Sequence, residues 1–390
     1  MTTRLVYLDN AATTPVRPEV RDAMLPYLDG EAFGNPSSPH RHGRSVRAAV
    51  EAARKRVGAA LGAPAKQVYF TGGGTEADNL AVIGAALASK AGGGPFRVAV
   101  AATEHKAVLA AAHAVEDLGG EAIILPVDPR GAVILEALEA ALAAGVAVVS
   151  VMWVNNETGV IQDVLDLHER CTRAGALFHV DAVQAFGKIP VDLRMLPGAL
   201  CTVSAHKVHG PKGAGALVVP DPSRVRPLIH GGGQQGGLRP GTENVPGIIG
   251  LGIACELAVA EQPAGAAHTR ALRDAFEAAV LGGIPDCGVN PPDGRRAPHV
   301  SSIGFVGADA EALLMHLDLA GICCSAGSAC STGSTSISHV LGAIGTPRER
   351  ATGTIRFSFD KLTSREDLDY VLEKLPKIVA KVRSLASLLR

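Results

Sequence analysis

Between residues 68 and 219 the chain alternates short apolar, β-rich runs with helical stretches rich in Ala, Leu and Glu, and this alternation constrains the fold most. Seven runs predict strands, at residues 68–70, 97–101, 122–127, 146–154, 177–183, 200–204 and 215–219. Several are continuously apolar, which is typical of strands covered on both faces. Helical patterns precede or separate them, at residues 45–61, 76–89, 106–118, 134–144 and 163–174. The alternation predicts an α/β fold with a mainly parallel, seven-stranded sheet.

The pattern changes near residue 220. A glycine-rich segment precedes a long helical stretch from about residue 245 to 281, and residues 291–298 have the Pro, Gly and Arg content of a loop. A smaller α+β region follows, with strand-like runs at 301–306 and 354–358 and helical runs at 310–320 and 365–389. The simplest partition is a large domain at 15–260 and a small α+β domain formed by residues 1–14 and 261–390.

Charge and composition exclude several classes of protein. The 37 Lys and Arg residues balance 38 Asp and Glu, so no basic excess indicates a nucleic-acid partner. The first residues lack a charged region followed by an apolar one, and the longest apolar stretch, 146–154, is far short of a membrane span. We therefore expect a cytoplasmic protein without membrane association and without direct nucleic-acid binding.

The cysteines are scattered and odd in number, which is not the pattern of a disulfide framework. They lie at positions 171, 201, 255, 287, 323, 324 and 330, and they form no paired CxxC set that would bind zinc. Four have apolar or helical surroundings and indicate small buried residues. Cys323 and Cys324 are expected to pack at the end of a helix or strand. Cys330 differs, because small residues surround it in the loop at about 323–336, and this predicts an exposed, mobile nucleophile.

A glycine-rich turn follows the first predicted strand, at residues 71–76. Consecutive glycines let backbone N–H groups approach an anion, and the start of the next helix adds partial positive charge. Thr75 is placed to act as a helix N-cap or as a phosphate ligand. A plain glycine turn with a helix cap is the alternative interpretation of this turn.

Two further motifs follow buried strands. Asp181 lies toward the end of the run 177–183, where a carboxylate is costly unless it is paired, and a protonated pyridine nitrogen is a suitable partner. Helix capping is the alternative role for Asp181. Lys207 lies just beyond the run 200–204, where burial lowers the pKa of an amine and makes it nucleophilic. Lys212 is the competing lysine, among Gly and Pro farther from the strand.

Ten motifs, in order along residues 8–359, resemble those of the cysteine desulfurases, and more narrowly of the nitrogenase-associated and housekeeping iron–sulfur-cluster group. They are YLDNAATTP, FGNPSS, GGGTEADN, TEH, VNNETGVIQD, HVDAVQ, SAHKVHGPKG, GGGQQGGLRPGTEN, SAGSACS and IRFSF. The resemblance implies an aspartate-aminotransferase-like fold, the cofactor pyridoxal 5'-phosphate (PLP) and a homodimer.

The resemblance also implies roles for individual residues. It assigns the catalytic roles to Cys330, Lys207 and His105, with Lys207 binding the cofactor covalently and His105 stacking on its ring. It assigns cofactor binding to Gly74, Thr75, His105, Asn156, Asp181, Gln184, Ser204, His206, Lys207 and Thr242. In this set Thr242 reaches the phosphate of the neighbouring subunit, Asp181 pairs with the ring nitrogen and Gln184 contacts the phenolic oxygen. Substrate binding falls to Arg356, Asn156 and Asn35.

The implied reaction converts L-cysteine to L-alanine and leaves the sulfur as a persulfide on Cys330, for transfer to an acceptor such as an iron–sulfur scaffold protein. One alternative is another PLP enzyme of the same fold, such as a selenocysteine lyase or an aminotransferase, and Cys330 argues against transamination. A second alternative is a sulfur-delivery or scaffold partner without catalysis. The joint presence of Lys207, Asp181, His105 and Arg356 argues against that alternative.

Overall fold

The computed structural model describes residues 4–30, 32–326 and 337–388, and its larger part is built on a seven-stranded sheet. The strand order is β2-β8-β7-β6-β5-β3-β4, and only β8 runs antiparallel to its neighbours. The strands are β2 (Val68–Thr71), β3 (Arg97–Ala101), β4 (Glu121–Leu125), β5 (Val148–Met152), β6 (Leu177–Asp181), β7 (Leu200–Ser204) and β8 (Gly215–Val218). The predicted α/β class and the mainly parallel seven-stranded sheet are confirmed.

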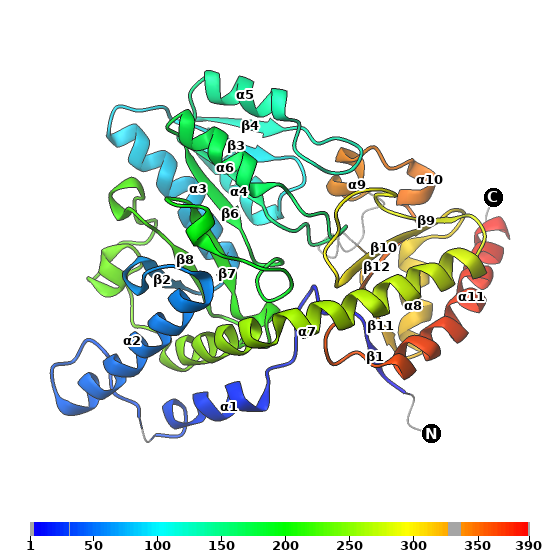
Figure 1. Ribbon diagram of the computed structural model, residues 1–390, viewed down its shortest axis with the longest axis horizontal. Helices are drawn as coiled ribbons and strands as arrows, with labels where there is room; N and C mark the ends of the chain where they lie inside the picture. The colour runs from blue at the N-terminus through cyan, green and yellow to red at the C-terminus, as the bar shows by residue number, and fades with distance from the viewer. Residues whose placement is uncertain (1–3, 31, 327–336, 389–390) are drawn as a thin grey trace.

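Helices cover both faces of this sheet (Figure 1). Alternate residues of a strand pack into the cores on opposite sides of the sheet. Val98 and Val100 of β3 pack with α3 and α4, whereas Ala99 and Ala101 belong to the core under the helices of the other face. The helices of the first face are α3 (Gly74–Ala91) and α4 (Lys106–Asp117). Those of the other face include α2 (Arg41–Leu61), α5 (Leu135–Ala143) and α6 (Val164–Arg173). Burial on both faces explains why the strands are apolar without interruption.

The smaller part has its own core around a three-stranded antiparallel sheet, ordered β12-β10-β9. Its strands and helices are β9 (Cys287–Val289), β10 (Val300–Phe305), β12 (Thr354–Ser358), α8 (Ala310–Leu319), α9 (His339–Ala343), α10 (Arg348–Ala351) and α11 (Arg365–Leu388). Phe276, Phe305 and Phe357 are fully buried in this core. The predicted α+β character of this region is therefore observed.

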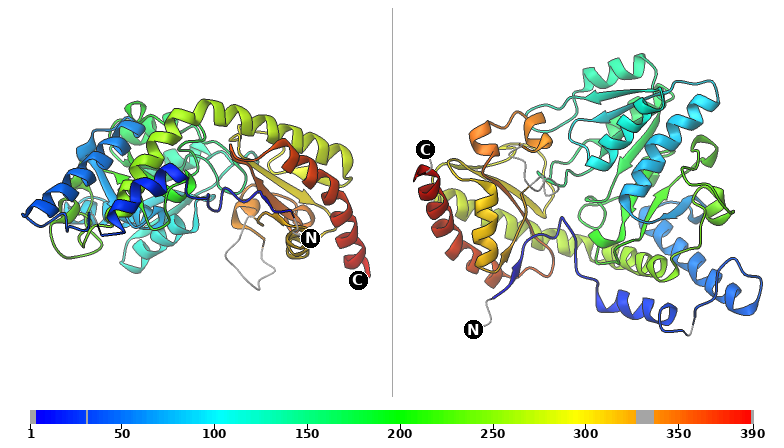
Figure 2. Two further views of the ribbon diagram at one scale, coloured as in Figure 1. Left: turned by 90° about the horizontal axis from the view of Figure 1, so that it is seen from below. Right: turned by 180° about the vertical axis from the view of Figure 1, so that it is seen from behind.

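The N-terminal segment connects the two parts. Its strand β1 (Val6–Tyr7) pairs in parallel with β11 (Ile322–Cys323) at the smaller part, and the chain then crosses to α1 (Pro18–Met24) at the larger part (Figure 2). Both termini lie at the smaller part. Cys323 thus lies in a short strand and Cys324 directly follows it, which agrees with the packing expected for both.

The helix α7 (Val245–Gly283) spans both parts, and the predicted domain boundary at residue 260 falls inside it (Figure 1). By length and composition α7 is apolar enough to cross a membrane. However, 56% of its most apolar window is buried inside the protein, where it packs against α1 and α2. It also places Phe276 in the smaller core. Its apolar sequence is therefore explained by its place as a core helix.

Candidate active site

A cavity of about 350 Å³ lies where the carboxyl ends of the central strands meet the N-terminal segment and β12. Open α/β sheets bind their ligands at this edge. Its walls consist of Ala11, Ala12, Gly74, Thr75, Asp78, His105, Lys106, Met152, Asn156, Glu157, Asp181, Val183, Gln184, Ser204, His206, Lys207, His339 and Arg356. Segments far apart in the sequence therefore contribute to one space.

Ten of the thirteen predicted site residues line this cavity. They are Gly74, Thr75, His105, Asn156, Asp181, Gln184, Ser204, His206, Lys207 and Arg356. Thr242 and Asn35 do not line it, and both are exposed. The side-chain oxygen of Asn35 accepts a hydrogen bond from the Ser37 N–H. Cys330 lies outside the described residues.

Lys207 follows β7 and is held by backbone carbonyls. Its Nζ donates to the oxygens of Ala11 and Ala12, each at 2.7 Å. Burial, together with the charge of Arg356, lowers the pKa of Lys207 to about 8, although Asp181 pulls in the opposite direction. The amine therefore reaches its neutral, nucleophilic form near physiological pH. Lys212, by contrast, is exposed and lines a neighbouring hollow.

Asp181 ends β6 and is only 4% exposed. Its Oδ1 accepts the Val183 N–H at 2.8 Å within a turn, so the alternative of helix capping does not apply. Burial raises the pKa of Asp181 to about 6, while the Val183 N–H and the charge of Lys207 oppose the rise. A carboxylate in this position favours a cationic ligand atom beside it.

Two buried acids near Asp181 were not predicted. Asp78 on α3 lines the cavity, and Glu104 accepts the Met152 N–H at 2.6 Å. Burial and the nearby charge of Asp181 raise the pKa of each well above its ordinary value. Close carboxylates in a low dielectric do not all ionise together, so we infer that Asp78 and Glu104 hold their protons. Asp78 lies four residues after Gly74, so the two lie on the same face of α3. This spacing in the sequence is the signal that could have identified Asp78.

His105 is the N-cap of α4, and its Nδ1 accepts the Ala107 N–H at 3.2 Å. The ring proton of the neutral form therefore lies on Nε2. Desolvation at the cavity wall, followed by the charges of Lys207, His339 and Lys106, lowers the pKa of His105. The ring is neutral near pH 7 and presents an N–H donor.

Arg356 projects from β12 and is 4% exposed. Its Nη1 donates to the carbonyl of Asn156 at 2.9 Å, and its Nη2 donates to Oδ1 of Asp9 at 2.8 Å. Its Nε is buried and has no hydrogen-bond partner among the described residues. Buried donors are usually satisfied, and a guanidinium matches a carboxylate in shape and charge.

The turn before α3 forms an anion cradle. The helix begins at Gly74, and its N-cap Gly73 offers no side-chain cap, so the first-turn N–H groups keep their hydrogen-bonding capacity. A Cβ on Gly74 would meet Cγ2 of Val183 at 3.2 Å, so the absence of a side chain keeps the cradle open. Thr75 is in the first turn and is not the N-cap. This arrangement fits a phosphate group.

Both flanks of the segment 327–336 are attached beside the cavity. On one side the Arg356 N–H donates to the Ser325 oxygen at 2.6 Å. On the other side Ser338 donates to the carboxylate of buried Glu157. Nε2 of His339 lies 2.9 Å from the backbone carbonyl oxygen of Glu104. Glu157 and His339 were not predicted, because their approach depends on tertiary contacts rather than on a local pattern.

These residues together fit PLP. Lys207 provides an amine of lowered pKa, Asp181 a buried carboxylate and the α3 turn an anion cradle, all on one cavity. An amine, a carboxylate partner for a ring nitrogen and a phosphate site are what this cofactor requires of a protein.

Comparison with known proteins agrees with this arrangement. The family model for class-V aminotransferases matches residues 6–371. Cysteine desulfurase of Cereibacter sphaeroides is 46% identical over 98% of this chain and 97% of its own length, and cysteine desulfurase IscS of Dictyoglomus turgidum is 44% identical over 98% and 96%. A solved NifS-like protein superposes with a TM-score of 0.90 at 36% identity, covering 97% of this chain and 100% of its own. The chain therefore belongs to the class-V aminotransferase family and, within it, to the cysteine desulfurases.

Proposed function

We propose that this chain is a PLP-dependent desulfurase that converts L-cysteine to L-alanine and carries the sulfur as a persulfide on Cys330. The observation that carries the proposal is the cavity itself. It gathers the amine of Lys207, the carboxylate of Asp181 and the guanidinium of Arg356, and the flanks of the segment with Cys330 are attached beside it. The names of the full-length relatives support the same activity.

When bound, PLP supplies an electron sink that makes the Cα proton of an amino acid labile. The chain's residues hold and orient it. Asp181 would balance the charge of the ring nitrogen, and the phosphate would be held by Gly74, Thr75, Ser204 and His206 at the cavity wall. Gln184 donates Nε2 to the Ala11 oxygen at 2.8 Å, and its second amide hydrogen is available to the phenolic oxygen. His105 presents its neutral ring for stacking.

The substrate is oriented by its carboxylate. Arg356 lines the cavity, and its Nε has no hydrogen-bond partner among the described residues. It binds that carboxylate, assisted by Asn156 from the same wall. Lys207 in its neutral form takes the Cα proton, and the N–H of His105 assists proton transfer. The thiolate of Cys330 then forms an S–S bond with the substrate sulfur as the Cβ–S bond breaks, and the electron pair of that bond stays with the carbon skeleton. The skeleton gains a proton at Cβ, regains one at Cα from Lys207 and leaves as L-alanine.

The direct test is product analysis with purified holoprotein. We expect L-cysteine to yield L-alanine and protein-bound sulfur in equal amounts, with sulfide released when a reductant is added. The holoprotein should absorb visible light at roughly 400 nm, as lysine-bound PLP does. A colourless, inactive protein would favour a sulfur-delivery partner. Turnover of selenocysteine alone, or amino transfer to a keto acid, would favour the other PLP enzymes.

Replacing Arg356 with lysine is expected to raise KM for L-cysteine by about 10- to 100-fold with little change in kcat. An ammonium cannot keep the contacts to Asn156 and Asp9 and also bind a carboxylate in a fork. Arg383→Lys is the matched control, because Arg383 donates to backbone carbonyls away from the cavity. Steady-state kinetics measures both variants. An unchanged KM in Arg356→Lys would assign the carboxylate to another residue.

We also propose a homodimer in which Thr242 serves the phosphate site of the neighbouring subunit. The exposure of Thr242 and its absence from its own subunit's cavity support this arrangement. Thr242→Ala subunits mixed with Lys207→Ala subunits are then expected to regain about half of the wild-type activity. Each mixed dimer has one site with both native residues. Differently tagged, co-expressed subunits allow the mixed species to be isolated and assayed. No recovery would place Thr242 at the site of its own subunit.

The remaining proposals concern organisation and partners. We propose the division into a large domain at 15–260 and a small domain of 1–14 and 261–390. The core that joins Val6 and Leu8 to residues between 272 and 382 supports it, although Ala297, Leu341, Ile344 and Ala351 pack into the core of the larger part. A cytoplasmic location and an acceptor protein such as an iron–sulfur scaffold follow from the proposed activity. Persulfide transfer from the loaded protein to candidate acceptors tests the latter.

A further inference from the structure

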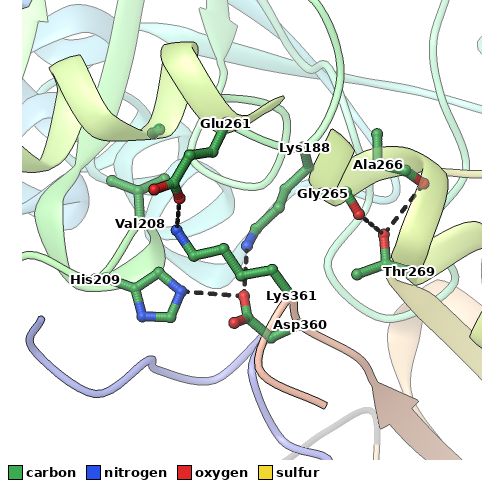
Figure 3. Close-up of a pocket in the computed structure, with 11 residues that line it drawn as sticks. Lys188, Val208, His209, Glu261, Gly265, Ala266, Thr269, Asp360 and Lys361 are labelled. Carbon is green, nitrogen blue, oxygen red and sulfur yellow. Dashed lines mark hydrogen bonds and ion pairs between the residues drawn. The ribbon is translucent and has the colours of Figure 1, made fainter. Parts of the chain in front are cut away.

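A buried charge cluster lies beside, but outside, the proposed active site. It surrounds a small cavity of about 30 Å³ and brings together His209, Asp360 and Lys188 (Figure 3). His209 is 2% exposed and comes two residues after Lys207. Its φ of 64° lies in the left-handed region, which non-glycine residues rarely adopt. The contacts of His209 therefore have to hold this conformation.

Both ring nitrogens of His209 face hydrogen-bond acceptors. Nδ1 lies 3.0 Å from the carbonyl oxygen of Pro15, and Nε2 lies 3.1 Å from Oδ2 of Asp360. A carbonyl oxygen only accepts, so Nδ1 is the donor there. A neutral imidazole has one N–H, so it satisfies only one of these two contacts.

Asp360 is in the ionised form that only accepts. Two contacts that do not involve His209 favour this ionised form, one with a cation and one with a backbone N–H. Nζ of Lys188 lies 3.2 Å from the same Oδ2, and Oδ1 accepts the Leu362 N–H at 3.1 Å. Nε2 of His209 is therefore a donor as well.

We propose that His209 is a doubly protonated positioning residue, which as an imidazolium joins the turn after Lys207 to Pro15 and to Asp360. The inference deepens the proposed function and rests on it where turnover is concerned. The three joined elements are those that carry the proposed site. Pro15 follows the carbonyls that hold Nζ of Lys207, and Asp360 lies four residues after Arg356.

Further hydrogen bonds connect His209 through Thr14 to His206, which lines the cavity. The His209 N–H donates to Oγ1 of Thr14 at 2.7 Å, and the Thr14 N–H donates to the His206 oxygen at 2.9 Å. Thr14 and Pro15 are thus fixed against His206 and His209, which lie on either side of Lys207 in the sequence. A small displacement of this segment would move the carbonyls that hold Nζ, and misplacement of about 1 Å is enough to slow catalysis strongly.

The other charges around His209 leave its partnership with Asp360 intact. From α7, Glu261 points into the same cavity, where it is paired with Lys361 (Figure 3). Glu261 is also paired with Arg17. Lys188 shares Asp360 with His209.

The proton count is tested by NMR on holoenzyme with ¹⁵N-labelled histidine. At neutral pH we expect two ring N–H signals for His209, assigned by their absence in His209→Asn. In Asp360→Asn we expect a single one, because the amide can donate to Nε2. One ring N–H in the wild type, or two in Asp360→Asn, would overturn the proposal. This arm uses no substrate, so it stands even if the proposed desulfurase activity fails.

The positioning role is tested by kinetics. His209→Asn tolerates the left-handed backbone but cannot span the ring contacts, and we expect kcat to fall by about tenfold or more with KM within twofold. Lys361→Gln is the matched control, since Lys361 lines the same cavity but pairs with Glu261. If His209→Asn does not fold, Asp360→Asn is expected to give the same kcat-only loss. A wild-type kcat in either variant, or an equal loss in Lys361→Gln, would contradict the role.

Discussion

Lys207→Ala is expected to abolish covalent attachment of PLP and to lower turnover by at least roughly a thousandfold, because one amine both binds the cofactor and moves the Cα proton. The side chain of Lys207 is half-buried and held by the carbonyls of Ala11 and Ala12, whereas Lys106, which also lines the cavity, is exposed. Borohydride reduction of the wild type followed by peptide mapping should label Lys207. Lys212→Ala, in the same segment, is the matched control and should retain attachment. A label on Lys212 would transfer the role to that residue.

The pKa of Lys207 adds a pH dependence to this prediction. Because the pKa is lowered to about 8, the amine is neutral above about pH 8. The rate at which apoprotein binds PLP covalently should therefore rise with pH and level off near that value. Asp181 raises this pKa and Arg356 lowers it, so Asp181→Asn should move the midpoint down and Arg356→Gln should move it up. Stopped-flow absorbance gives the midpoint, and an unshifted midpoint in both variants would exclude this electrostatic control.

Much of the fold was predictable because the central strands are buried on both faces. The runs at 97–101, 200–204 and 354–358 match β3, β7 and β12 residue for residue. The run 146–154 is longer than β5, because apolarity continues where the ladder ends. There the Trp153 N–H bonds to the Asp181 oxygen, and Val154 pairs with Ile161 in a turn. The two-residue strands β1 and β11 exist only through their mutual pairing, which no local pattern predicts.

The site shows the same division between local and tertiary information. Asp181 ends a strand, Gly74 and Lys207 come shortly after one, and parallel strands bring such positions to one edge. Asp9, Glu104 and Glu157 become important only through contacts made across the fold, with Arg356, Met152 and Ser338 respectively. The position of the ring proton of His105 on Nε2 likewise depends on a contact of the folded chain, the hydrogen bond from the Ala107 N–H to Nδ1. Sequence therefore identifies which chemistry is present, and structure decides which protonation states support it.

Cys330→Ser is expected to lower release of alanine and sulfide by about a thousandfold or more while leaving cofactor binding intact. A serine hydroxyl is not ionised near neutral pH, whereas a thiolate is a strong nucleophile toward sulfur. Attachment of PLP and binding of the substrate carboxylate depend on Lys207 and Arg356, so L-cysteine should still change the visible spectrum of the variant. Absorbance and quantified alanine separate these two steps.

Cys323 and Cys324 are the matched controls, because each lies a few residues from Cys330 and is held by the fold. Burial, and then the charge of Asp9 among others, raises the pKa of Cys324, and burial with Asp318 raises that of Cys323. Both thiols therefore keep their protons and are poor nucleophiles. Cys323→Ser and Cys324→Ser should keep activity within about twofold and cost at most about 1 kcal/mol in unfolding free energy. Full activity in Cys330→Ser together with loss of activity in either control would identify Cys323 or Cys324 as the nucleophile. In the proposed reaction only a cysteine thiolate of the protein accepts the sulfur. Activity that survives all three substitutions would therefore identify an enzyme that works by another reaction and needs no protein thiol.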